Sequence, residues 1–103
     1  LGRTSCFPGA AGSALGALDA VVAARARTMP EGRYTTRLLA AGVRRVAQKV
    51  GEEGVETALA AVAQDDEALL GEAADLAYHL LVLLRARGLG LADVERVLAD
   101  RAA

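Results

Sequence analysis

Two short acidic blocks stand out in a chain that is otherwise rich in Ala, Leu and Val. The residues that could do chemistry in them are Lys49, Glu52, Glu53 and Glu56 in the first block, then Glu72 and Asp75 in the second. Residues three and four apart lie on one face of an α-helix, so each block predicts an acidic helix face. Two such faces that meet would form a cage of oxygen ligands, which is what a hard divalent cation such as Mg²⁺ requires.

The types of ligand narrow the choice of metal. Cys6 and His79 lie far apart, and the chain has no Cys/His pair at the spacing of a zinc site. A di-iron carboxylate site needs Glu-x-x-His motifs, whereas the residue three after Glu72 is Asp75. A set of oxygen ligands therefore predicts Mg²⁺, with Mn²⁺ as the alternative.

Charged helix faces are more often solvated than functional, so the pattern needs further support. Glu52 and Glu56 repel each other across one helical turn, at a cost of a few tenths of a kcal/mol in an isolated helix. Asp75 directly precedes the most apolar segment, residues 76–84, where an unpaired carboxylate would be costly. A bound cation would relieve both problems. We expect His79, one turn after Asp75, to be a core histidine bonded to that residue.

Basic residues precede the first acidic block, and all but one of the 12 basic residues are arginine. Arginine is suited to bidentate phosphate contacts, and a Mg²⁺ ion held by few carboxylates usually completes its shell with phosphate and water. The candidates for phosphate contacts are Arg33, Arg37, Arg45 and Lys49. The net charge of −1 argues against a nucleic-acid partner bound by bulk electrostatics.

The elements that must position these residues all have helical periodicity, and no strand-like alternation occurs. We expect helices over residues 13–27, 35–63, 66–87 and 92–101, with a possible break of the second at Gly42 or Gly51. The expected N-caps are Ser13, Thr35 or Thr36, and Asp65 or Asp66, and the expected stop signal is Gly88. The pattern predicts an all-α antiparallel bundle of four to five helices with short connections.

Length and composition predict one small domain. Residues 1–12 are expected to be an irregular tail, and residues 13–103 the helical domain. Apolar residues make up 53% of the chain but aromatic residues only 3%, so the core is thin and a homodimer that shares it is expected. The single cysteine excludes an internal disulfide and favours a reducing, cytoplasmic compartment. No apolar run is long enough to span a membrane.

The spacing of the acidic blocks, Glu-Glu-x-x-Glu followed by Glu-x-x-Asp, resembles the signature of the MazG-like all-α nucleoside triphosphate pyrophosphohydrolases. The longer strings are similar to the phosphoribosyl-ATP pyrophosphohydrolase family of histidine biosynthesis. They are Tyr34-Thr-Thr-Arg-Leu-Leu, Gln48-Lys49-Val-Gly51-Glu52-Glu53-x-Val-Glu56-Thr and Glu72-Ala-Ala-Asp75-Leu-x-Tyr78-His79-Leu-Leu. The similarity extends from Pro30 to the C-terminus and departs at Arg33, where that family's pattern has Ser.

The resemblance implies Mg²⁺-dependent hydrolysis of phosphoribosyl-ATP to phosphoribosyl-AMP and pyrophosphate. It also implies a metal shell drawn from Glu52, Glu53, Glu56, Glu72 and Asp75, with Glu53 and Glu72 as the catalytic carboxylates. Two alternatives stay open at this point. One is a house-cleaning pyrophosphohydrolase that acts on ordinary or damaged nucleotides, and the other is a non-catalytic helical dimerisation domain whose acidic residues are merely solvated.

The first residues carry a second resemblance. Gly2-Arg3-Thr4-Ser5-Cys6-Phe7 is similar to the end of a phosphoribosyl-AMP cyclohydrolase domain, whose final cysteine is a zinc ligand. In many organisms the two activities are fused in one chain. The resemblance implies that this chain is the C-terminal domain of such a bifunctional protein, with Cys6 as a zinc ligand separated from its partners.

Overall fold

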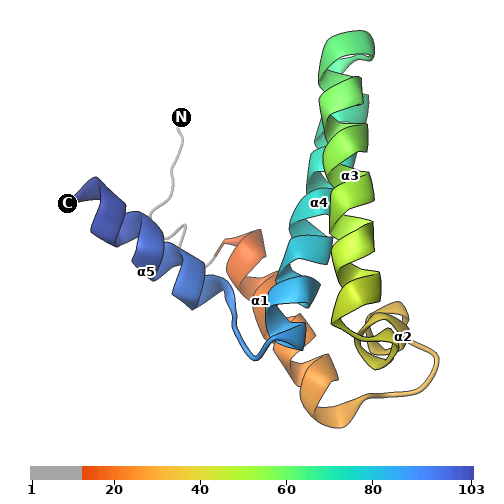
Figure 1. Cartoon of the computed structure of the whole chain (residues 1–103), viewed down its shortest axis with the longest axis vertical. Coiled ribbons are helices and arrows are strands. Elements are labelled where there is room, and N and C mark those ends of the chain that lie inside the picture. Colours follow the sequence, from red (N-terminus) through yellow and green to blue (C-terminus); the bar gives the residue numbers. More distant parts are fainter. Residues whose placement is uncertain (1–12) are drawn as a thin grey trace.

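The computed structural model describes residues 13–103, and these residues form five α-helices and no strand. In chain order the helices are α1 (Ala14–Thr28), α2 (Tyr34–Ala41), α3 (Val43–Ala63), α4 (Asp66–Ala86) and α5 (Leu91–Ala102), as drawn in Figure 1. The predicted all-α class is therefore confirmed. The expectations for residues 1–12, including Cys6, lie outside the described part. Among the helices described, none is both long and apolar enough to cross a bilayer.

Two of the helices begin at the predicted capping residues. The Ser13 hydroxyl accepts a hydrogen bond from the Gly16 N–H at 3.4 Å, and the Asp65 carboxylate accepts one from the Ala68 N–H at 2.9 Å. These side chains satisfy backbone donors that the first turn of a helix leaves free. The capping residues predicted from the local sequence therefore mark where α1 and α4 start.

The prediction that Thr35 or Thr36 caps α2 is wrong. Helix α2 starts at Tyr34, and its N-cap residue is Arg33, whose side chain makes no capping hydrogen bond. Thr35 lies inside the helix, is only 5% exposed, and its hydroxyl is bonded to the hydroxyl of Tyr78 on α4. The threonine that looked like a cap thus serves a contact between helices.

Gly42 separates α2 from α3, as one of the two predicted break points. Its φ of 96° and ψ of 169° fall in a region that is essentially restricted to glycine. Helix α3 continues through Gly51 and Gly54 without interruption. The corner at Gly42 turns the chain so that α2 lies across the lower end of α3 (Figure 1).

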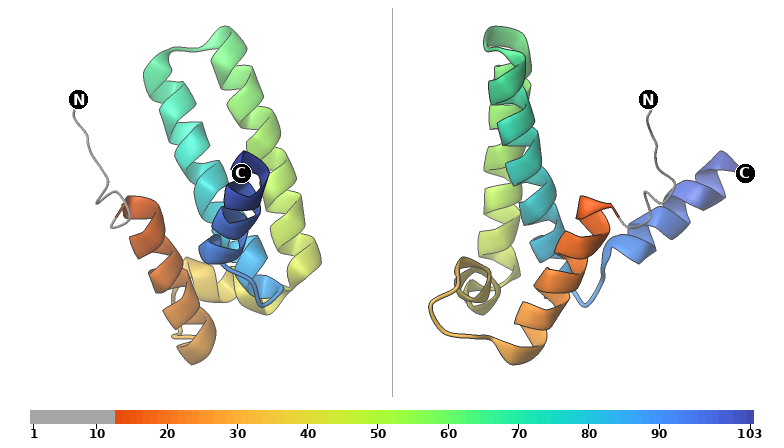
Figure 2. Two further views of the ribbon diagram at one scale, coloured as in Figure 1. Left: turned by 90° about the vertical axis from the view of Figure 1, so that its left-hand side faces the viewer. Right: turned by 180° about the vertical axis from the view of Figure 1, so that it is seen from behind.

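Helices α3 and α4 form a long antiparallel hairpin, and α1 and α2 pack against the end of it that is remote from its turn (Figures 1 and 2). The main core cluster takes one buried residue from each of these four helices, namely Val22, Leu38, Val46 and Val82. The core therefore lies at one end of the hairpin. The other end is not covered by any described helix.

Helix α5 projects away from the bundle and contacts it mainly through α1 (Figure 2). The carboxylate of Asp19 on α1 accepts a hydrogen bond from the Leu91 N–H at 3.3 Å and lies 3.4 Å from the Arg85 guanidinium. Helix α5 contributes no fully buried residue. Its position thus depends on the chain turn and on this tie to Asp19.

Candidate metal and active site

Three carboxylates from the two helices of the hairpin converge at its interface. Glu53 and Glu56 come from α3, and Glu72 comes from α4. One oxygen of each lies within 4.8 Å of an oxygen of both others. Because the hairpin is antiparallel, the acidic face of α3 and the start of the acidic face of α4 meet. The predicted convergence of the two blocks is therefore found for these three residues.

Glu53 is the most deeply placed of the three, with 7% of its surface exposed. Its Oε1 lies 3.8 Å from the Lys49 ammonium and 3.9 Å from Nδ1 of His79. Its Oε2 is buried and has no hydrogen-bond partner among the described residues. A buried carboxylate oxygen without a partner is unfavourable by itself, and a cation that the carboxylates share would satisfy it. The donor set thus fits a hard divalent ion.

Glu72 faces the α3 carboxylates from the other helix. Partial burial raises the pKa of Glu72 above its usual value, and the negative charge of Glu56 raises it further. The charges of Glu53 and Asp75 act on this pKa in the same direction. The cluster is therefore crowded with like charge, and a bound cation would relieve that crowding.

His79 lies beside Glu53 and is itself only 6% exposed. Its Nδ1 lies 2.8 Å from the backbone carbonyl oxygen of Asp75, and its Nε2 lies 3.0 Å from the hydroxyl of Tyr34. The expected bond between His79 and Asp75 exists, although it uses the carbonyl of Asp75 and not its carboxylate. Sequence reasoning missed the contact with Tyr34, which joins residues 45 positions apart. The only hint of this contact in the sequence was that Tyr34 and His79 both lie in the segments that resemble the pyrophosphohydrolase family.

Glu52 and Asp75 lie outside the group of three. The Glu52 carboxylate accepts a hydrogen bond from the Gln48 amide at 3.0 Å and lies 3.7 Å from the Lys49 ammonium, on an exposed part of α3. Asp75 is exposed, and its charge is close enough to affect the pKa of Glu72. That either residue ligates a metal stays a prediction.

The predicted phosphate-binding residues differ in their distance from the carboxylates. Lys49 contacts them directly. Arg45 lies one helical turn before Lys49 on α3 and is exposed. Arg37 lies on α2 with its guanidinium 5.8 Å from the centre of the Tyr34 ring, and Arg33 is exposed just ahead of α2. The structure thus brings one of the four cations to the cluster.

Comparison with known proteins gives one family and a consistent set of relatives. The family described as phosphoribosyl-ATP pyrophosphohydrolase matches residues 15–102 of this chain. Proteins named histidine biosynthesis bifunctional protein HisIE from Xanthomonas axonopodis and Xylella fastidiosa are each 69% identical over 98% of this chain. One of the same name from Yersinia pestis is 50% identical over 98% of the chain. The match takes in 49% or 50% of these proteins, so the chain spans about half the length of the curated relatives it matches.

Proposed function

Since the chain belongs to the phosphoribosyl-ATP pyrophosphohydrolase family, we propose that it hydrolyses phosphoribosyl-ATP to phosphoribosyl-AMP and pyrophosphate in histidine biosynthesis. One observation supports a catalytic role most strongly. The buried Oε2 of Glu53 has no hydrogen-bond partner in the described part of the chain, although two further carboxylates lie beside it. A purely structural helix pair would gain nothing from this arrangement, because a buried carboxylate oxygen without a hydrogen-bond partner destabilises the fold.

We assign Glu53, Glu56 and Glu72 as the residues that hold Mg²⁺, with Mn²⁺ as a substitute. The bound ion would neutralise negative charge on the triphosphate as the phosphoanhydride breaks. Lys49 is placed to donate hydrogen bonds to phosphate oxygens at the edge of the cluster. Arg45, Arg37 and Arg33 would bind outlying phosphates of the substrate.

Hydrolysis requires that a water oxygen form a bond to phosphorus while the bond to the bridging oxygen breaks and pyrophosphate leaves. Glu53 and Glu72 are the carboxylates that we assign to orient this water and accept its proton. They approach the cluster from different helices, so a water bound between them would be oriented from two sides.

The assembly that we propose is a homodimer formed by the uncovered end of the hairpin. Large apolar side chains are exposed there on both helices, namely Val55, Leu59, Val62 and Leu70. Pairing two hairpins would bury these side chains and enlarge a core that is small in one copy. The relatives are named bifunctional, and residues 2–7 resemble the end of a cyclohydrolase domain, so we further propose that the chain is one half of a bifunctional protein whose other half is a cyclohydrolase. The single cysteine supports a cytoplasmic location for it.

The test is release of pyrophosphate from phosphoribosyl-ATP, compared with release from a panel of ordinary nucleoside triphosphates at equal Mg²⁺. The proposal predicts a much higher kcat/KM for phosphoribosyl-ATP. Release only from ordinary nucleotides would support the house-cleaning alternative. Release from none of them, by a chain that also fails to bind Mg²⁺, would leave the structural alternative.

A further inference from the structure

We infer that Tyr34 is a positioning residue: its hydroxyl fixes the orientation of His79, and the ring of His79 packs against the buried carboxylate of Glu53. The inference rests on the metal site of the proposed function and adds a third element to it, because Tyr34 belongs to α2. The hydrogen bond of the Tyr34 hydroxyl goes to His79, so the effect of Tyr34 on the cluster is transmitted by His79.

The hydrogen bonds of His79 determine which nitrogen carries the proton. The partner of Nδ1, at 2.8 Å, is the backbone carbonyl of Asp75, which can only accept, so Nδ1 donates. In a neutral imidazole Nε2 is then an acceptor, and the Tyr34 hydroxyl, 3.0 Å away, donates to it. Both ring nitrogens are thus engaged, and the ring is held at both ends.

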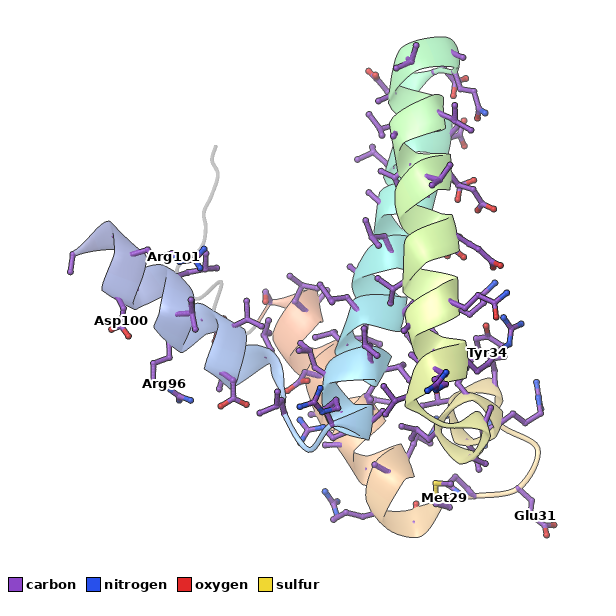
Figure 3. All side chains as sticks on the ribbon, viewed as in Figure 1. Met29, Glu31, Tyr34, Arg96, Asp100 and Arg101 are labelled. Carbon is purple, nitrogen blue, oxygen red and sulfur yellow. The ribbon has the colours of Figure 1, made fainter. Side chains whose placement is uncertain are left out.

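The Tyr34 ring is itself held in place by its neighbours. It stacks on Tyr78 with ring centres 6.1 Å apart, and the Arg37 guanidinium lies 5.8 Å from its centre. Figure 3 shows Tyr34 on the side of α2 that faces the hairpin, away from the loop that carries Met29 and Glu31. Tyr34 nevertheless remains 43% exposed, so burial of the ring alone does not explain why the side chain lies here. Its hydroxyl, by contrast, reaches a buried acceptor.

Loss of this hydroxyl would leave Nε2 of His79 buried without a donor. The ring could regain a partner for Nε2 only by rotating, and rotation would break the bond from Nδ1 to the Asp75 carbonyl. Nδ1 lies 3.9 Å from Oε1 of Glu53. Rotation of the imidazole would therefore change the packing around that carboxylate. Ligand groups must be held within roughly 0.5 Å of their productive positions, so metal affinity should fall.

The chain offers a matched control in the same pair of helices. The hydroxyl of Tyr78 on α4 is bonded to the hydroxyl of Thr35 on α2, so Tyr78→Phe also removes one hydroxyl bond between α2 and α4. That substitution keeps the ring that packs on Tyr34 and leaves both nitrogens of His79 bonded. Comparing it with Tyr34→Phe separates an effect on the site from a general loosening of α2.

The experiment titrates MgCl₂ into the wild-type chain and both variants by calorimetry, without substrate. Tyr34→Phe is expected to weaken Mg²⁺ binding about tenfold, in the range found for residues that support a metal ligand. Tyr78→Phe is expected to bind Mg²⁺ as the wild type does, although both variants lose some thermal stability. His79 is the only histidine in the chain, so ¹⁵N labelling of histidine reports its tautomer directly. The wild type and Tyr78→Phe should show a protonated Nδ1, and Tyr34→Phe should show a changed imidazole signal.

Equal losses of Mg²⁺ affinity in the two variants would overturn the inference, as would an unchanged imidazole signal in Tyr34→Phe. A wild-type chain that binds no Mg²⁺ would overturn both the metal site and the positioning role. A wild-type chain that binds Mg²⁺ and shows the predicted difference between variants, but does not hydrolyse phosphoribosyl-ATP, would leave the positioning role intact and refute only the proposed reaction.

Discussion

Glu53 is buried between α3 and α4, and its Oε2 has no hydrogen-bond partner among residues 13–103. Glu56 and Glu72 add like charge within 4.8 Å. Such crowding opposes folding of the free chain, and a shared cation reverses it. At the scale of single residues, stability and metal binding should therefore change in opposite directions when a carboxylate is neutralised.

Glu53→Gln should abolish Mg²⁺ binding and pyrophosphate release. The neutral amide has similar size but offers the ion a single, weaker oxygen, so the fall in activity should exceed the factor of about 100 that marks the upper range for residues that only support a ligand. Calorimetry and the pyrophosphate assay measure the two effects. Glu95→Gln, on the exposed surface of α5, is the control. Near-normal activity of Glu53→Gln would show that this carboxylate is not part of the site. The Mg²⁺ affinity of Glu52→Gln, measured in the same way, would decide whether Glu52 is a ligand.

Glu72→Gln should raise the melting temperature of the metal-free chain at neutral pH. The pKa of Glu72 is raised in the folded state, so the folded chain binds this proton more tightly than the unfolded chain. Stability is lost as pH rises through the folded pKa, and the variant escapes this loss. The gain over the wild type should shrink as the pH falls below the usual pKa of a glutamate, where Glu72 is protonated in both states.

The control for Glu72→Gln is Glu67→Gln, in the first turn of α4. Its charge interacts favourably with the helix N-terminus, so this substitution should not raise the melting temperature. Scanning calorimetry at several pH values provides the comparison. A lower melting temperature of Glu72→Gln at neutral pH would contradict the account of crowded charge.

The sequence predicts which carboxylates of the site share one helix, but not which residues meet across two helices. Helical spacing predicts that Glu53 and Glu56 share a face, because residues three apart do so in any α-helix. It does not predict which α4 carboxylate meets them, since that depends on the rotation and register of two packed helices. The contact between Tyr34 and His79 is also beyond local spacing, because it depends on how α2 docks.

At the scale of elements, side-chain chemistry close in sequence determines most boundaries. Ser13 and Asp65 cap the helices they were expected to cap, since capping involves only the next few backbone N–H groups. Thr35 is the counterexample, because its hydroxyl is used by Tyr78 on another helix. A break at either Gly42 or Gly51 was compatible with the sequence, and the structure has it at Gly42.

These two glycines should respond in opposite ways to substitution by alanine. Gly42→Ala should destabilise the chain by about 1–3 kcal/mol, because a side chain is strained at its φ of 96°. Gly51→Ala should stabilise α3 by about 1 kcal/mol, since alanine is the better helix former and an added Cβ meets nothing within 4 Å. Urea unfolding at one protein concentration measures both. Equal effects of the two substitutions would contradict the assigned corner.

At the scale of the whole molecule, the bundle is unevenly covered. Helices α1 and α2 enclose one end of the hairpin, while Val62 is 87% exposed and Leu70 is 67% exposed near its turn. Helix α5 projects on another side, with charged residues such as Arg96, Asp100 and Arg101 along it (Figure 3). We propose that the hairpin of a second copy packs on the uncovered end, because both copies expose the same apolar side chains there and pairing would bury them.

If the chain forms the proposed homodimer, the double substitution Val62→Glu with Leu70→Glu should convert it into a monomer. Burying two charges in each copy at an apolar interface is strongly unfavourable, whereas in the monomer both positions remain in water. Sedimentation equilibrium measures the mass. Val97→Glu on α5, also at an exposed apolar position, is expected to leave the mass unchanged. A wild-type chain that sediments as a monomer, or dissociation caused by Val97→Glu alone, would contradict the placement of the interface.

The most direct test of the central claim is pyrophosphate release from phosphoribosyl-ATP by residues 1–103, measured with Mg²⁺ and again after chelation with EDTA. Release is expected to be rapid with Mg²⁺, to stop on chelation and to return when Mg²⁺ is restored. Release that continues at the same rate in EDTA would contradict the carboxylate metal site, and no release under either condition would contradict the proposed reaction.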